Sequence, residues 1–270
     1  MLFRSKPALV LFIAHFLSRR AQSINQRKTL QQACLAVAVL AALVVVADLG
    51  TAMVPVLTVL IVFWIAGLEW KYMVRVGVAG LLLCVVAVFS RGYRLGRVIA
   101  YVDPEYSVIE LVDTHHWIRN YVQRSTTIRD ASYQPRQSKI AVGTGGVLGV
   151  GLMQSKQKLM FLPEAHTDFI YATIGEELGL WGASAVLAGF VVLLWRGVRL
   201  FLLGRDDFGR YLALGVTVTI VLQALMNITV VLDMAPTKGF PLPMISFGGS
   251  SLVSTMASLG MLLSVSEHEG

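Results

Sequence analysis

The chain has 270 residues, of which 56% are apolar and only 14% are charged, and its mean hydropathy is +0.68. This composition excludes a water-soluble domain and indicates a protein whose solvent is lipid. The net charge of +7 does not indicate a nucleic-acid partner, because the basic residues cluster at the ends of apolar runs. Cys34 and Cys84 lie inside such runs, where a cysteine behaves as a small apolar residue and not as part of a disulfide framework.

Six apolar runs approach the ~17–25 residues that cross a bilayer core, and we expect each to form a membrane-spanning helix. They are Leu30–Ala47, Thr51–Leu68, Met73–Phe89, Leu178–Trp195, Tyr211–Leu232 and Ser250–Val265. A shorter run, Pro7–Leu17, crosses about half of a bilayer and predicts the inner end of a seventh helix whose beginning is missing from this sequence. The predicted fold class is therefore all-α: a polytopic membrane helix bundle that forms one domain over residues 1–270.

The basic residues predict the orientation of these spans. Ser18–Thr29, the turn after Leu68 and Arg196–Arg210 are rich in Lys and Arg, so we expect them to be cytoplasmic. Asp48–Gly50, a long loop over residues 90–167 and Asp233–Gly249 then lie on the outer face.

The long outer loop contains two recognisable patterns. Apolar residues recur at helical spacing within Tyr106–Arg129, which predicts one or two short amphipathic helices at the membrane interface. Gly143–Gly151 is rich in glycine but lacks the spacing of a dinucleotide-binding loop, so we expect a hinge or a close crossing of helices there.

Residues 156–179 hold the densest group of polar side chains. Pro163 suits a first helical turn and predicts that a helix begins there, which would place Glu164 and Asp168 on one helix face. Repulsion between two carboxylates can raise the pKa of one of them, as a general base for a sugar hydroxyl requires. A helix N-terminus that attracts acidic residues explains Glu164 equally well, whereas Asp168 lies one turn too far along.

Basic and further acidic residues flank that pair. Lys156 and Lys158 could stabilise the charge of a departing pyrophosphate, or could simply extend toward the membrane interface. His166 could carry protons or bind substrate, but we favour a hydrogen-bonded structural histidine; without a second close ligand it does not indicate a metal site. For Glu176 and Glu177 we favour a supporting role, above all an ion pair with Lys or Arg.

The last outer connection, Asp233–Gly249, contains three prolines and three glycines and predicts an irregular turn. Irregular backbone at membrane depth is tolerated only against protein or a water-filled cavity. We therefore expect Lys238 to contact phosphate, and Ser246, Ser250 and Ser251 to form hydrogen bonds with backbone or substrate.

Several of these stretches together resemble the SEDS (shape, elongation, division and sporulation) family of peptidoglycan glycosyltransferases. The resemblance covers nearly the whole chain and is closer to the cell-division branch, FtsW, than to the elongation branch, RodA. It is carried by Asp48–Thr51 (DLGT), Ser155–Leu159 (SKQKL), Leu162–Ile170 (LPEAHTDFI), Gly175–Gly179 (GEELG) and Pro236–Ser251 (PTKGFPLPMISFGGSS).

The resemblance implies that the protein polymerises lipid II on the outer face of the bacterial cytoplasmic membrane, with Asp168 as the catalytic carboxylate and Asp48 in a supporting position. The acceptor's 4-hydroxyl would attack the donor's anomeric carbon, and undecaprenyl pyrophosphate would leave. It also implies a transpeptidase of the class B penicillin-binding type, other divisome membrane proteins and membrane lipids as partners. A divalent cation, Mg²⁺ or Mn²⁺, is compatible with this chemistry, although no metal ligand set is visible.

The chain also departs from the family pattern. Family members usually have about ten spans, so the resemblance implies that this sequence begins within the fourth span. Ala47 replaces a usual Pro, Phe247 replaces a common Tyr, and Glu105–Ala131 forms a longer insert than the family pattern predicts.

Two other functions compete with the polymerase. A transporter for a lipid-linked precursor would need ionisable residues within the spans, where they are scarce in this sequence. A non-catalytic scaffold for a transpeptidase would not need Asp168 at all.

Overall fold

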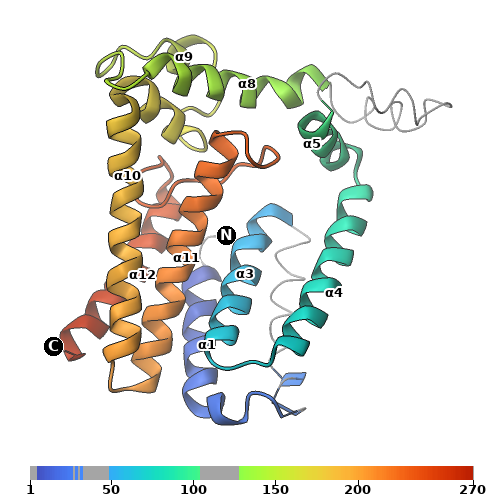
Figure 1. The fold of residues 1–270 in the computed structure, drawn as a ribbon, viewed down its shortest axis with the longest axis vertical. Helices are drawn as coiled ribbons and strands as arrows, with labels where there is room; N and C mark the ends of the chain where they lie inside the picture. Colours follow the sequence, from blue (N-terminus) through green and yellow to red (C-terminus); the bar gives the residue numbers. More distant parts are fainter. Residues whose placement is uncertain (1–4, 27, 30, 33–48, 104–127, 270) are drawn as a thin grey trace. The chain divides into compact units, whose positions relative to one another are not determined.

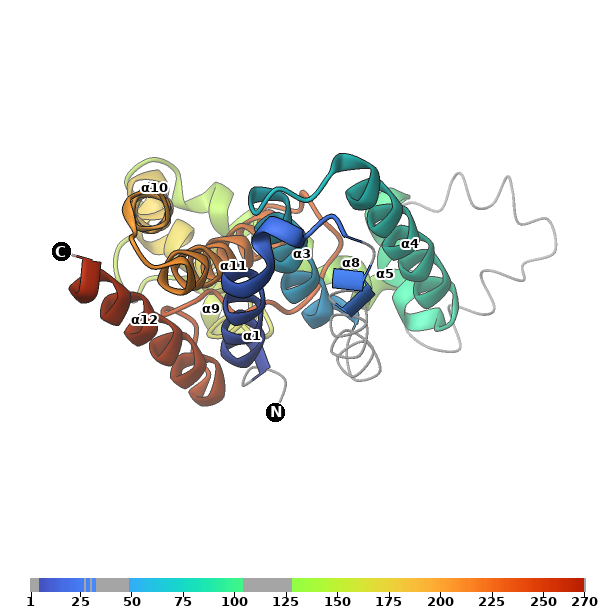
Figure 2. The same cartoon turned by 90° about the horizontal axis from the view of Figure 1, so that it is seen from below.

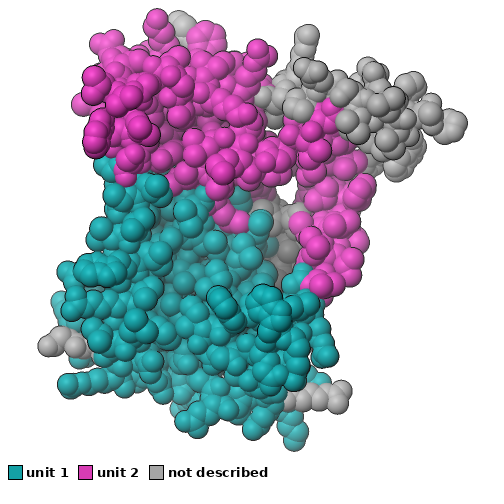
Figure 3. All heavy atoms as spheres, in the orientation of Figure 1, with its two compact units in different colours: residues 1–77, 185–225, 240–270 teal, residues 78–184, 226–239 magenta. Residues whose placement is uncertain are grey.

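The computed structural model describes residues 5–26, 28–29, 31–32, 49–103 and 128–269. Within these ranges the chain forms helices, turns and irregular segments, without a β-strand, so the predicted all-α fold class is confirmed. The chain divides into two compact units, which Figure 3 distinguishes by colour. Unit 1 comprises residues 1–77, 185–225 and 240–270, and unit 2 comprises residues 78–184 and 226–239.

Unit 1 is built around α1 (Ser5–Arg20), α3 (Leu49–Ile65) and α11 (Asp207–Val231), which lie side by side in Figures 1 and 2. A short turn of 3₁₀ helix, η2 (Ala21–Ser23), follows α1, and α12 (Gly249–Glu269) also contacts α1. The shared core consists of apolar side chains that repeat at helical spacing on each helix. It includes Leu9, Ile13 and Leu17 of α1, Val59, Val62 and Phe63 of α3, and Leu214 and Val218 of α11.

Within the described residues, four helices are long and apolar enough to cross a membrane: α4 (Trp70–Phe89), α10 (Ile170–Leu203), α11 and α12. On α4 none of the described side chains is buried, and Leu81 is 65% exposed. Such an apolar surface is costly in water and normal in lipid. The predicted polytopic membrane bundle is confirmed. Helix α3 covers most of a further predicted span, Thr51–Leu68, and α1 covers the shorter run Pro7–Leu17. Most of Leu30–Ala47 and Asp48 lie outside the described residues.

The α10–α11 contact within unit 1 depends on a small residue. A Cβ atom added at Gly197 of α10 would lie 1.9 Å from Thr217 Oγ1 of α11, so the two helices approach too closely for alanine. Small residues allow such approach between membrane helices, where no hydrophobic effect drives association.

The connection after α11 lacks helix from residue 232 to residue 248, as its prolines predict. In unit 1 its backbone is bound by side chains: Gln223 Nε2 donates to the Pro241 carbonyl at 2.7 Å, and the Leu242 amide donates to Ser246 Oγ at 2.6 Å. Irregular backbone at this position is thus satisfied by protein groups.

Unit 2 contains α5 (Gly92–Val102), α8 (Ile128–Gly145), α9 (Lys156–Met160) and the first turns of α10. Helix α5 packs against α8, and α8 is fixed to the end of α11 by a bond from Ser138 Oγ to the Val231 carbonyl at 2.7 Å. The helices predicted within Tyr106–Arg129 fall almost entirely on residues 104–127, which lie outside the described residues.

The glycine-rich run docks onto a break in α10 at Gly179, where φ is 65° and ψ is −160°. The Val150 amide donates to the Glu176 carbonyl and the Leu180 amide donates to the Gly146 carbonyl, each at 3.0 Å. These bonds replace helical ones that the break removes. A Cβ atom added at Gly149 would lie 2.2 Å from the Glu177 carbonyl oxygen, so the predicted close crossing is what the structure contains.

Candidate functional site

Asp168 lies in a turn that directly precedes α10, not on a helix. Residues 163–169 form turns and α10 begins at Ile170, so the predicted helix start at Pro163 is wrong. Glu164 takes a left-handed conformation with φ of 57°, which ends any helical path at once. Its carbonyl accepts from the amides of Thr167 and Asp168, both at 3.1 Å. The shared helix face predicted for Glu164 and Asp168 therefore does not exist.

The Asp168 carboxylate is half-buried against the 236–239 segment of the last connection. A Cβ atom added at Gly239 would lie 2.2 Å from Asp168 Oδ2, so only glycine fits beside this carboxylate. The backbone of Asp168 is fixed as well, because Asn227 Nδ2 donates to its carbonyl at 2.6 Å. Two segments distant in sequence thus hold one acidic side chain.

Burial raises the pKa of Asp168, and the nearby negative charge of Glu164 raises it further. The positive charges of Arg97 and Lys238 act in the opposite direction, but the raising effects are larger. Desolvation is the main cause of the raised pKa of Asp168. Glu164 adds to it, as predicted, although the two residues lie on a turn and not on a helix. A carboxylate of raised pKa beside two cations can accept a proton close to a developing negative charge.

Arg97 of α5 is the residue that sequence reasoning missed. Its Nη1 donates to the Thr237 carbonyl at 3.0 Å, and its Cζ lies 4.5 Å from the centroid of the Tyr93 ring. The only local signal was the helical spacing of Arg91, Arg94 and Arg97, which does not indicate a partner 140 residues further along the chain.

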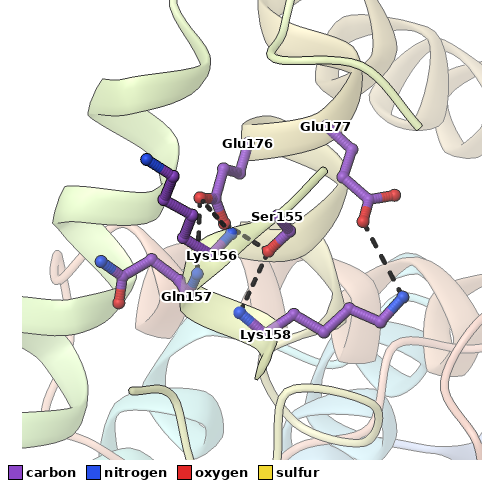
Figure 4. Close-up of polar contacts among 6 residues, drawn as sticks. All are labelled: Ser155, Lys156, Gln157, Lys158, Glu176 and Glu177. Carbon is purple, nitrogen blue, oxygen red and sulfur yellow. Dashed lines mark hydrogen bonds and ion pairs between the residues drawn. The ribbon is translucent and has the colours of Figure 1, made fainter. Parts of the chain in front are cut away.

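The second acidic pair supports structure around α9, as Figure 4 shows. Glu176 is 3% exposed; its carboxylate accepts from Ser155 Oγ and from the Lys156 amide, the latter at 3.1 Å. Ser155 Oγ in turn accepts from the Lys158 amide at 3.0 Å, so both side chains cap the first turn of α9. Lys158 Nζ lies 3.8 Å from Glu177 Oε1, an ion pair of the kind that the sequence favoured.

The remaining predicted site residues are dispersed. His166 is exposed in the Asp168 turn, and Lys238 lies between Thr237 and Gly239 in unit 2. Ser246, Ser250 and Ser251 belong to unit 1, where Ser246 is buried and holds the Leu242 amide. Asp48 lies outside the described residues. The roles of these residues in binding substrate stay predictions.

The described residues include no group of three or more His, Cys, Asp or Glu side chains that could hold a metal ion. Glu164 and Asp168 are two carboxylates, and Mg²⁺ can be bound by one or two carboxylates together with substrate phosphates. A divalent cation at this site therefore stays a prediction.

Comparisons with known proteins agree with the sequence motifs. A family model named for FtsW, RodA and SpoVE and described as "Cell cycle protein" matches residues 4–270. The "Probable peptidoglycan glycosyltransferase FtsW" of Geobacter sulfurreducens is 37% identical over 97% of this chain and 65% of its own length. "Stage V sporulation protein E" of Bacillus subtilis is 36% identical over 97% of this chain and 67% of its own length.

A solved structure extends the similarity to the fold. One chain of "Structural coordination of polymerization and crosslinking by a peptidoglycan synthase complex" matches with a TM-score of 0.71 at 25% identity. The match covers 99% of this chain and 70% of that one. This chain spans about two thirds of the length of the curated relatives that it matches. It is an integral membrane protein that belongs to the FtsW/RodA/SpoVE family of cell cycle proteins, the SEDS family that its motifs resemble.

Proposed function

We propose that this protein is a peptidoglycan glycosyltransferase of cell division, which polymerises lipid II with Asp168 as the general base. The reaction joins the 4-hydroxyl of an acceptor sugar to the anomeric carbon of a lipid-linked donor and releases undecaprenyl pyrophosphate. It takes place at the outer face of the bacterial cytoplasmic membrane.

The observation that carries this proposal is the environment of Asp168. Its pKa is raised by burial and by Glu164, while Arg97 and Lys238 place positive charge nearby. The reaction needs both features at one place, because the attacking hydroxyl loses a proton as the pyrophosphate gains charge. The lipid tails of both substrates stay in the bilayer, so the membrane itself contributes to their alignment.

The known relatives support the substrate and a partner. A relative at 37% identity carries the name peptidoglycan glycosyltransferase, and the similar solved chain belongs to a complex that couples polymerisation to crosslinking. We propose a class B penicillin-binding transpeptidase as the partner, because crosslinking consumes the glycan strand that this reaction makes.

The direct test supplies purified lipid II to the protein in detergent, with and without the transpeptidase, and separates the products on a gel. We expect glycan chains from the wild type and none above background from Asp168→Asn. Asp207→Asn is the matched control, because among the described residues the Asp207 carboxylate pairs with Arg210 in an exposed ion pair, which contributes little to stability.

Other outcomes would select a different function. Polymer from Asp168→Asn at the wild-type rate would remove the assigned base. Translocation of lipid II across vesicles without any polymer would support a transporter, and binding of the transpeptidase without either activity would support a scaffold.

A further inference from the structure

We infer that Arg97 binds the pyrophosphate group of the lipid-linked donor at the Asp168 site. This inference rests on the proposed function and deepens it, because the sequence had assigned that task to Lys156, Lys158 and Lys238.

The guanidinium of Arg97 is held from two sides. Nη1 donates to the Thr237 carbonyl at 3.0 Å, and the Tyr93 ring lies under the cation at 4.5 Å. A guanidinium carries five N–H donors in a planar fork, so a single bond to Thr237 leaves it able to bind two phosphate oxygens. An arginine that is already ordered loses less entropy when it binds an anion.

The basic residues of unit 2 differ in whether they form an ion pair with a carboxylate. Lys158 lies 3.8 Å from Glu177 and Lys139 lies 2.6 Å from Asp233. In the described part of the chain Arg97 forms no such ion pair with a carboxylate. Its charge nevertheless acts on Asp168 together with that of Lys238. Arg97 is thus a basic residue near Asp168 that forms no ion pair with a carboxylate among the described residues.

The chemistry requires a cation at this place. As the acceptor oxygen bonds to the anomeric carbon, its proton passes to the Asp168 carboxylate. The bond from the anomeric carbon to the pyrophosphate oxygen breaks, and its electron pair remains on that oxygen. A guanidinium bound to the pyrophosphate stabilises this added charge without moving.

Binding of undecaprenyl pyrophosphate to the purified chain in detergent tests the inference without requiring polymerisation. We expect tighter binding of undecaprenyl pyrophosphate than of undecaprenyl phosphate, and an about tenfold loss in Arg97→Gln that removes this preference. Arg97→Lys should retain part of the affinity, since it keeps the charge but loses the fork. Inorganic pyrophosphate should compete only at much higher concentration, because it lacks the lipid, and competition at equal concentration would contradict a lipid-linked ligand.

Two matched controls separate binding from bracing. Arg94→Gln removes an arginine one turn away on α5, whose Nη1 instead donates to the Ala87 carbonyl. Tyr101→Phe removes another bond from α5 to the same connection, from Tyr101 Oη to the Met234 carbonyl at 2.9 Å. Both variants should bind like the wild type.

Two results would overturn the inference: unchanged affinity in Arg97→Gln, or an equal loss in Tyr101→Phe, which would show that α5 only braces the connection. The proposed function fails separately, if the wild type binds the pyrophosphate lipid through Arg97 but makes no polymer.

Discussion

The two acidic pairs of unit 2, Glu176 with Glu177 and Glu164 with Asp168, differ in their burial and in their partners. Glu176 and Glu177 are 3% and 9% exposed; Glu176 accepts hydrogen bonds at the start of α9, and Glu177 pairs with Lys158. Glu164 is exposed and Asp168 is half-buried, and in the described chain neither forms an ion pair.

The difference separates carboxylates that stabilise the fold from carboxylates available for chemistry. A buried carboxylate that accepts several hydrogen bonds satisfies those donors and contributes to stability. A carboxylate that is partly desolvated beside a like charge has a raised pKa, which costs stability and prepares it to accept a proton.

The largest expected effect comes from Asp168→Asn. Loss of a general base lowers the rate of polymerisation by about 10²–10⁴-fold. Because the ionised form of Asp168 is disfavoured in the folded protein, the thermal midpoint should stay constant or rise at neutral pH. A lowered midpoint would mean that Asp168 belongs with the structural carboxylates.

Glu176→Ala should give the reverse result, a loss of stability. It leaves Ser155 Oγ and the Lys156 amide without their acceptor, which costs about 1.5–3 kcal/mol for bonds to a charged group. Chemical denaturation of the protein in mixed micelles measures this loss. If Glu176→Ala left stability unchanged but abolished activity, Glu176 would have a role in catalysis and not in stabilising the fold.

Gly239→Ala should disturb the active carboxylate itself. The new methyl group would overlap Asp168 Oδ2, so the carboxylate or the connection must move, and we expect about a tenfold lower rate. Gly143→Ala is the control, because an added Cβ there meets no atom within 4 Å. Equal rates for both variants would show that the position of Asp168 is not critical.

The smallest effect is a shift in pH dependence for Glu164→Gln. Polymerisation requires ionised Asp168, so the rate falls as the pH drops through its raised pKa. Removing the negative charge of Glu164 lowers that pKa, so the acid limb moves to lower pH, and the effect is small because the exposed charge is screened. Lys238→Gln should move the limb to higher pH, and a shift in the same direction for both variants would contradict this electrostatic account.

Hydropathy was sufficient to place three of the predicted spans. The predicted runs Met73–Phe89, Tyr211–Leu232 and Ser250–Val265 match α4, α11 and α12 within a few residues, because lipid demands a continuous apolar surface. The start of α10 was misplaced, because a proline permits a first turn but does not reveal that the next residue adopts a left-handed conformation.

The candidate site was only partly accessible to sequence reasoning. Asp168 and Glu164 stand out because they are acidic residues close together in an apolar chain. Arg97 does not, since its importance comes from Thr237 and Asp168, which are far from it in sequence. Likewise, the glycines of 143–151 indicated close contact, but not that their partner is the break at Gly179.

The interlock between that loop and α10 has a consequence for biosynthesis. Residues 146–151 leave the ribosome before residues 176–180, so the groups that complete the broken helix are made before the break itself. When α10 is delivered to lipid, the Glu176 and Glu177 carbonyls find the Val150 and Gly151 amides already synthesised. This order of synthesis avoids a stage in which the carbonyl groups at the break in α10 lack hydrogen-bond donors while they face lipid, which offers none.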